Sequence, residues 1–322
     1  MSRRGALSAR VVWTLKLFVS LALLGYIASQ ISLRALGEAL AGADLLLVGA
    51  GLALSAAGMA AATVQLRVIG EQQGIRLSPR DAFALNLATS FYNLLLPGYI
   101  AGGVARWYRL ARAHSEYQPV AALAVVLANR VVELVAVLVL GLLFWTADPL
   151  ARSHRLIPAI FAGLLLALVG VILVIIRFRE SARRVLPARW GDRVAAGIDA
   201  AARFRQMPGI TLRRLVGAAA ARHLLMIAAF YCFGLALHLP LSIAISGWTR
   251  TVVALAGMLP VSVGGLGVRE GSLIAVLGPY GIPAHAAAAL GLLLFARELA
   301  AALAGGVIEG RTFLSLGEAR ET

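Results

Sequence analysis

Two stretches of the sequence combine a proline, paired glycines and an arginine at matched spacing. Residues 96–106 read LPGYIAGGVAR, and residues 259–269 read LPVSVGGLGVR. Proline lacks a backbone donor and stops a helix, whereas glycine lets the backbone approach a ligand closely. Backbone amides freed in this way can bind an anion, and an arginine can hold a phosphate through two parallel hydrogen bonds. These residue types therefore favour the binding of an anionic group.

The residues that we expect to bind this group come from both stretches and from two further positions, 130 and 270. They are Pro97, Gly102, Gly103, Arg106, Arg130, Pro260, Gly264, Gly265, Arg269 and Glu270. An alternative is that the glycines serve close helix packing, because Gly98–Gly102 and Gly267–Gly271 are small-xxx-small pairs. An alternative role for Glu270 is to neutralise its neighbour, Arg269. The presence of two matched stretches, each ending in arginine, favours substrate binding.

Further ionisable residues lie within apolar segments, where charge is costly and usually faces the interior of a helix bundle. Arg130 and Glu133 are one helical turn apart and can form an ion pair. The pair would serve either the structure of the helix bundle or a binding site for a lipid headgroup. Arg297 and Glu298 are adjacent, so we expect them to point to different faces and to need separate partners. Glu133 and Glu298 are candidates for proton coupling. Arg222 lies too deep in its apolar segment for its side chain to reach the membrane surface easily by snorkelling.

The composition is that of an integral membrane protein. Of the 322 residues, 60% are hydrophobic and 14% are charged, whereas soluble domains are about 25% charged. The net charge of +15 is carried by arginines between apolar runs, which fits membrane topology and anionic lipid rather than nucleic acid. Cys232 is the single cysteine, and the histidines are scattered without metal-ligand spacing. We therefore expect no disulfide, metal, cofactor or nucleic-acid partner.

The apolar segments predict an all-α polytopic membrane protein. A helix needs about 20 apolar residues to span a bilayer. The six segments that qualify are 11–30, 44–66, 119–145, 157–177, 214–237 and 284–306. Two further apolar stretches, 82–105 and 243–278, are interrupted by the proline–glycine phrases and are predicted to be re-entrant hairpins. Two short crossings are the alternative for 243–278.

The loop arginines predict the orientation of these segments. Most of them fall in the loops on the same side as both termini, which places the termini in the cytoplasm. The stretch 82–105 then enters from inside and 243–278 from outside. This arrangement predicts an inverted-topology repeat of 1–146 and 147–322, with a basic cytoplasmic loop at 178–213. Broken segments in corresponding halves are typical of transport sites, and the hairpins are expected to line a shared cavity.

Three parts of the sequence resemble one known family. The stretch from Asn93 to Arg106, the pair Asn129-Arg130, and the stretch from Leu259 to Glu270 are similar to the lysylphosphatidylglycerol synthase transmembrane region, or flippase-like family. The resemblance covers nearly the whole chain and implies a role in the traffic of lipids, hopanoids or polyprenyl-linked glycans. Relatives often carry an acid after the first Gly-Gly pair, where this chain has Val104-Ala105. The sequence ends soon after the last predicted span, so we expect a stand-alone member without the synthase domain.

These patterns together predict a lipid translocator of the bacterial cytoplasmic membrane. It would move an anionic or phosphate-bearing lipid, a phospholipid or a polyprenyl-linked lipid, between leaflets by alternating access. P-loop, HExxH and GxSxG motifs are missing from the sequence, so we do not expect an enzyme. One alternative is a non-catalytic subunit that docks a lipid- or glycan-synthesis enzyme through 178–213. A less favoured alternative is an intramembrane enzyme using Glu133 and Glu270 on a lipid-linked substrate.

Overall fold

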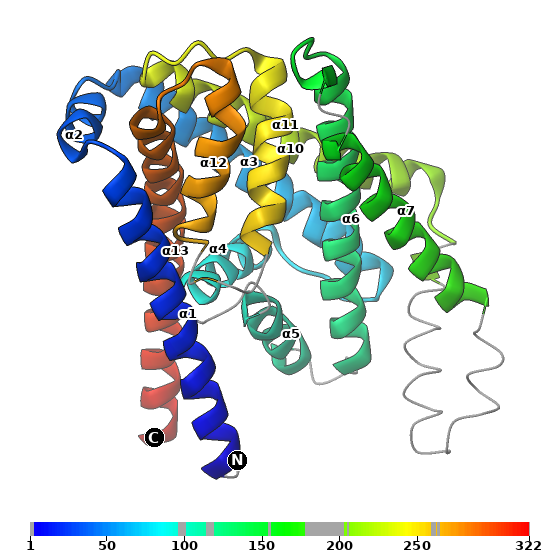
Figure 1. Cartoon of the computed structure of the whole chain (residues 1–322). Coiled ribbons are helices and arrows are strands. Elements are labelled where there is room, and N and C mark those ends of the chain that lie inside the picture. The colour runs from blue at the N-terminus through cyan, green and yellow to red at the C-terminus, as the bar shows by residue number, and fades with distance from the viewer. Residues whose placement is uncertain are drawn as a thin grey trace. The chain divides into compact units, whose positions relative to one another are not determined.

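The computed structural model describes residues 3–95, 101–113, 119–153, 156–177, 203–204, 206–258, 262 and 265–321. Every regular element in these ranges is helical (Figure 1). The elements are α1 (Arg3–Gln30), α2 (Leu33–Ala41), α3 (Leu45–Gln72), α4 (Pro79–Leu95), α5 (Ala101–Ala113), α6 (Pro119–Thr146), η1 (Ala151–Ser153), α7 (Leu156–Arg177), α10 (Gly209–Ala236), α11 (Ile243–Met258), α12 (Val268–Leu277), η2 (Gly278–Tyr280) and α13 (Ala284–Glu321). The predicted all-α class is confirmed for the described residues.

The starts of α3 and α4 follow from local sequence. Asp44 precedes α3, and its Oδ1 accepts a hydrogen bond from the backbone N–H of Leu46 at 2.8 Å. Ser78 precedes α4, and its Oγ accepts from the backbone N–H of Asp81 at 3.1 Å. Pro79 then occupies the first helical position, where its missing N–H costs nothing. Side-chain oxygens at these positions satisfy backbone donors that a helix leaves without a partner.

Five described helices are long and apolar enough to cross a membrane: Leu45–Gln72, Pro119–Thr146, Leu156–Val174, Gly209–Ala236 and Ala284–Arg311. A sixth span is present if Leu17–Gln30 and Leu33–Ala41, which meet at an angle of 89°, are taken as one broken span. The prediction of several membrane spans is therefore confirmed at five or six. Of the predicted span 11–30, the part Leu17–Gln30 qualifies together with α2.

The surface of α7 shows why such helices suit lipid. Leu166, Val171, Leu173 and Val174 on this helix are all more than half exposed. A helix with apolar side chains all around it is stable in hydrocarbon, because its backbone groups are satisfied within the helix. These exposed apolar side chains are suited to contact with the apolar tails of lipids.

Two helices extend past predicted boundaries. The helix α10 begins at Gly209, within the predicted basic loop 178–213. The helix α13 continues to Glu321, beyond the predicted span 284–306. A helix can extend past the membrane, so the predicted loop and span stay predictions. Residues 178–202 and 205 of the basic loop lie outside the described part of the chain.

The chain divides into two compact units. Unit 1 comprises Met1–Ala56, Leu87–Gly103 and Met226–Thr322, and unit 2 comprises Ala57–Asn86 and Val104–Leu225. The unit boundaries fall within helices α3, α4, α5 and α10. The predicted division into repeats 1–146 and 147–322 concerns symmetry and stays a prediction.

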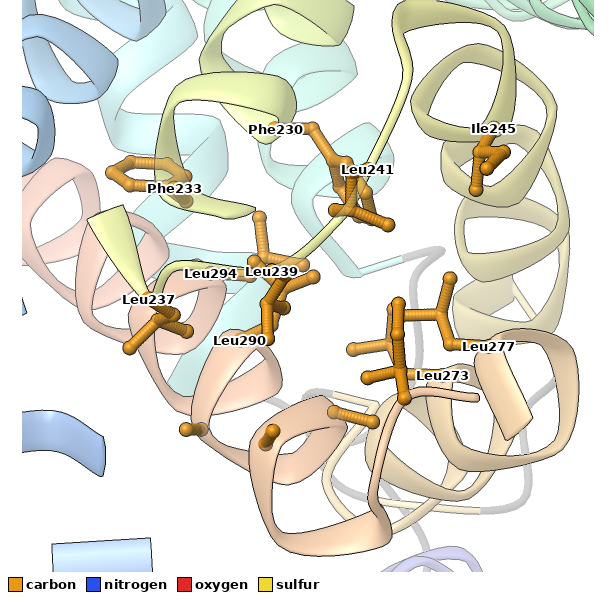
Figure 2. Close-up of a cluster of buried hydrophobic side chains, with 14 of the residues drawn as sticks. Phe230, Phe233, Leu237, Leu239, Leu241, Ile245, Leu273, Leu277, Leu290 and Leu294 are labelled. Atoms are coloured by element: carbon orange, nitrogen blue, oxygen red, sulfur yellow. The ribbon is translucent and has the colours of Figure 1, made fainter. Parts of the chain in front are cut away.

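Each unit has its own apolar core. In unit 1, side chains of α10, α12 and α13 meet, among them Phe230, Phe233, Leu273 and Leu290 (Figure 2). In unit 2, side chains of α3, α4, α5 and α6 meet; the cluster includes Leu66, Ile69, Leu85, Leu110 and Val125. Each core holds in place the helices that carry that unit's charged residues.

Glycine permits close helix packing in unit 1, and this leads to a stability prediction. A Cβ at Gly305 of α13 would overlap the backbone of Leu87 and Ala88 in α4. We expect Gly305→Ala to lower the free energy of unfolding in detergent by about 1–3 kcal/mol, the usual cost of overpacking. Gly310→Ala on the same helix meets open space in the described structure and should raise it by up to about 1 kcal/mol. Equal stabilities in thermal unfolding would contradict this close packing.

Candidate functional site

The first proline–glycine phrase joins α4 to α5. Pro97 lies in 96–100, outside the described residues, whereas Gly102 and Gly103 belong to the first turn of α5. The backbone N–H of Gly102 donates to Asn93 Oδ1 of α4 at 3.0 Å, and a Cβ on Gly102 would lie 2.5 Å from the Thr89 carbonyl oxygen. The start of α5 therefore lies directly against the last turns of α4, and only glycine fits at the contact.

The second phrase joins α11 to α12, which pack against each other (Figure 1). Pro260 and Gly264 lie outside the described residues. Gly265 and Gly267 have φ angles of 75° and 81°, a left-handed conformation that favours glycine. Glu270 Oε2 accepts from the backbone N–H of Gly267 at 2.7 Å. Glu270 thus caps α12.

Equal sequence spacing does not give the two arginines equal positions in their helices. Arg106 lies near the middle of α5, which begins at Ala101, whereas Arg269 follows the first residue of α12. The difference arises because Gly265 and Gly267 hold the chain in a turn, so α12 starts later in its phrase than α5 does.

A carboxylate on α6 binds several donors in unit 2. Glu133 is 8% exposed, and its Oε1 accepts from Arg222 Nη1 of α10 and from Asn129 Nδ2, the latter at 2.7 Å. Its Oε2 accepts from Arg130 Nη1 at 3.5 Å, which confirms the predicted pairing along α6. Asn129 Oδ1 in turn accepts from Gln65 Nε2 of α3 at 2.9 Å. Three helices thereby hold Glu133.

Arg106 extends this group. It is 9% exposed, and its Nη2 donates to Asn86 Oδ1 of α4 at 2.8 Å. Asn86 Nδ2 donates to Thr63 Oγ1 of α3 at 3.3 Å. The guanidinium groups of Arg222, Arg130 and Arg106 all lie within electrostatic reach of Glu133. We call Arg106, Arg130, Arg222 and Glu133 the arginine cluster.

The arginine cluster is suited to binding an oxyanion. Guanidinium N–H groups form the same paired, charge-assisted bonds with carboxylate and with phosphate. The side chains of Arg130 and Arg222 are 27% and 26% exposed, compared with 11% for Glu133. The two cations are thus more accessible than the carboxylate that they bind. Charges at such positions in membrane proteins usually mark a pathway or a binding site.

A second group of charges lies in unit 1. Arg269 Nη2 donates to Glu298 Oε2 of α13 at 2.5 Å, and Arg297 Nη2 donates to Glu298 Oε1 at 3.0 Å. One prediction from the sequence is therefore wrong in part. Arg297 and Glu298 bind each other, because their long side chains meet although their Cα atoms are adjacent. Each also has a partner of its own, Met226 for Arg297 and Arg269 for Glu298.

The accessibility of the unit 1 charges differs from one residue to the next. The side chain of Arg269 is 7% exposed and that of Glu298 is 40% exposed. Gly265 lies beside Arg269, since a Cβ on it would be 3.6 Å from Arg269 Nη2. The structure thus brings Gly265, Arg269 and Glu298 together, while Glu270 faces Gly291 of α13.

Sequence analysis missed several polar residues of these groups. Gln65 and Asn86 were not assigned to a site, and Arg222 was noted for its depth without a partner. Glu309, 5% exposed on α13, was also missed; it accepts from Tyr92 Oη of α4 at 2.9 Å. The signal that could have found all four is a polar side chain within an apolar segment, because such a group needs a partner.

The spans and their internal charges define a multi-pass integral membrane protein. The family model of the lysylphosphatidylglycerol synthase TM region matches residues 13–306. The chain therefore belongs to this family, as the resemblance of its phrases predicted. No curated protein matches the chain.

Proposed function

We propose that this protein is a lipid translocator that binds a phosphate-bearing headgroup at the arginine cluster. The observation that carries the proposal is the pairing of Arg130 and Arg222 with Glu133, together with buried Arg106 on α5, within helices of unit 2. Buried charge is costly in hydrocarbon and is usually retained for function. A binding site for a charged headgroup gives these arginines such a function. In this proposal the protein is a carrier and not an enzyme.

The transport cycle that we propose is alternating access. The two broken segments, α4–α5 and α11–α12, are proposed to be the re-entrant hairpins of an inverted-topology repeat, an architecture typical of secondary transporters. The membrane is proposed to be the bacterial cytoplasmic membrane, with both termini in the cytoplasm. The bias of arginines towards the loops on the terminal side supports this orientation.

The roles of the remaining residues follow from their contacts. Gly102 allows the close approach of α5 to α4, and Gly265 lies beside Arg269. Arg269 would bind an anion only after its pair with Glu298 opens, so we assign it a step later than Arg106. Glu298, half-exposed between two arginines, is the proposed site of proton coupling in unit 1, and Glu133 is the proposed site in unit 2.

A leaflet-specific assay tests the proposal. Purified protein in liposomes would be given leaflet-labelled phosphatidylglycerol, aminoacylated phosphatidylglycerol, a polyprenyl phosphate and a neutral lipid, with and without a proton gradient. We expect selective movement of a phosphate-bearing lipid by the wild type and its loss in Arg106→Ala/Arg269→Ala.

Three results would contradict the proposal. Absence of movement of every lipid by folded wild-type protein would instead support a subunit that docks a lipid- or glycan-synthesis enzyme through its basic loop. Full activity of the folded double variant would overturn the site assignment. Chemical conversion of a lipid-linked substrate, lost in Glu133→Gln or Glu270→Gln, would indicate an intramembrane enzyme.

A further inference from the structure

We propose that Glu133 is a resident counter-anion, which an incoming lipid phosphate displaces from Arg222 and Arg130. The ligand class rests on the proposed function, but the exchange itself concerns binding and can be tested without transport. In this view the ion pairs of Arg222 and Arg130 with Glu133 are replaced, when the lipid binds, by bonds from the arginines to phosphate.

The first argument is that ligand and Glu133 would compete for the same donors. Both oxygens of Glu133 are engaged, Oε1 by Arg222 Nη1 and Oε2 by Arg130 Nη1. A guanidinium presents its donors in one planar fork, and carboxylate and phosphate fit that fork in the same way. A phosphate that binds either guanidinium through the N–H that Glu133 accepts must therefore take the place of the carboxylate.

The second argument concerns the direction of approach. Arg130 and Arg222 each expose about twice the fraction of side chain that Glu133 does, at 27%, 26% and 11%. On its buried side Glu133 is held by Asn129, and Asn129 is held by Gln65. An anion arriving from the exposed side meets the arginines first, and the neutral amides keep the carboxylate in place while the arginines turn away from it.

The third argument is energetic. A carrier must bind its ligand and then release it, so a site with very high affinity would not turn over. Removing a charge from its partner in a low-dielectric site is expensive, and the returning carboxylate of Glu133 offsets that loss when the ligand leaves. Glu133 therefore lowers the affinity of the site and makes release easier.

A binding measurement tests the exchange. Titration calorimetry would follow short-chain phosphatidic acid, with short-chain phosphatidylcholine as the zwitterionic comparison, binding to the full chain in detergent. Glu133→Gln keeps the size of the side chain and an acceptor for Asn129 but removes the charge. We expect it to bind phosphatidic acid about tenfold more tightly, a factor equivalent to about 1.4 kcal/mol. Glu38→Gln, which alters the exposed Arg34–Glu38 pair, should leave the affinity unchanged.

A double variant separates exchange from a general change in charge. If the higher affinity of Glu133→Gln comes from freeing Arg222, then Glu133→Gln/Arg222→Gln should lose most of the tenfold gain in affinity for phosphatidic acid. If Glu133→Gln fails to fold, Glu133→Asp keeps the charge but shortens the reach to Arg222, and it should bind about threefold more tightly, a factor equivalent to about 0.65 kcal/mol.

Three outcomes would overturn the exchange: unchanged or weaker binding in the folded glutamine variant, the same gain in the double variant, and no saturable binding by the wild type. If binding follows the expected pattern but no lipid is translocated, the proposed function is wrong and the exchange of anions at the arginine cluster is still supported.

Discussion

Replacing Glu133 with leucine is expected to lower the free energy of unfolding in detergent by about 3–5 kcal/mol. Glu133 is buried on α6 and accepts hydrogen bonds from Arg130, Arg222 and Asn129. Leucine removes the acceptor and the negative charge together, so that Arg130 and Arg222 lose their counter-ion and buried Asn129 loses an acceptor that water cannot easily replace. The measurement is an unfolding titration, with retention of helix content checked by circular dichroism.

The exposed pair Arg34–Glu38 supplies the matched control for this result. Its side chains are 90% and 66% exposed, and exposed ion pairs contribute about 0–1 kcal/mol. Glu38→Leu should therefore change the free energy of unfolding by less than about 1 kcal/mol. A loss of the same small size in Glu133→Leu would show that the arginine cluster does not contribute to stability as its contacts indicate.

The second large effect is expected on translocation. We expect Arg106→Ala to lower the initial rate of movement of a phosphate-bearing lipid about 100-fold, because a charge-assisted hydrogen bond contributes about 1.5–3 kcal/mol. Arg106→Lys should recover part of the rate, since lysine keeps the charge but cannot form two parallel bonds. Rates would be measured at low lipid concentration in liposomes, with equal amounts of inserted protein.

Arg112 on the same helix is the control for Arg106. Its guanidinium lies 4.4 Å from the centre of the exposed Tyr108 ring, whereas Arg106 faces Asn86. Arg112→Ala should leave the rate within about twofold of wild type, since an exposed side chain contributes little to a buried contact. A comparable loss in both variants would assign the effect to the overall basic charge of α5.

The charged residues show how far sequence reasoning reaches. The pair Arg130–Glu133 could be predicted because residues three apart lie on the same face of a helix. Its completion by Arg222 could not, since 89 residues separate Arg222 from Glu133. The expectation that Arg297 and Glu298 point apart was wrong because it considered only Cα directions, although long side chains can turn back towards each other.

The broken segments show the same limit in the backbone. Proline and paired glycines correctly indicated where α4, α5, α11 and α12 would be interrupted or packed closely. The spacing could not show that Glu270 caps α12 or that Asn93 caps α5. Those contacts depend on the turn that the glycines adopt and on which helix lies beside it.

The sequence by itself determined the class of protein, its family, most of its spans and the residues that carry charge into the membrane. These properties depend on composition, on segment length relative to the bilayer, and on local rules of helix geometry. Only the tertiary structure decided which charges meet: Glu133 with Arg222, and Arg269 with Glu298. The physical reason is that an ion pair depends on the separation of two groups in space, and helix packing brings together residues far apart in the chain.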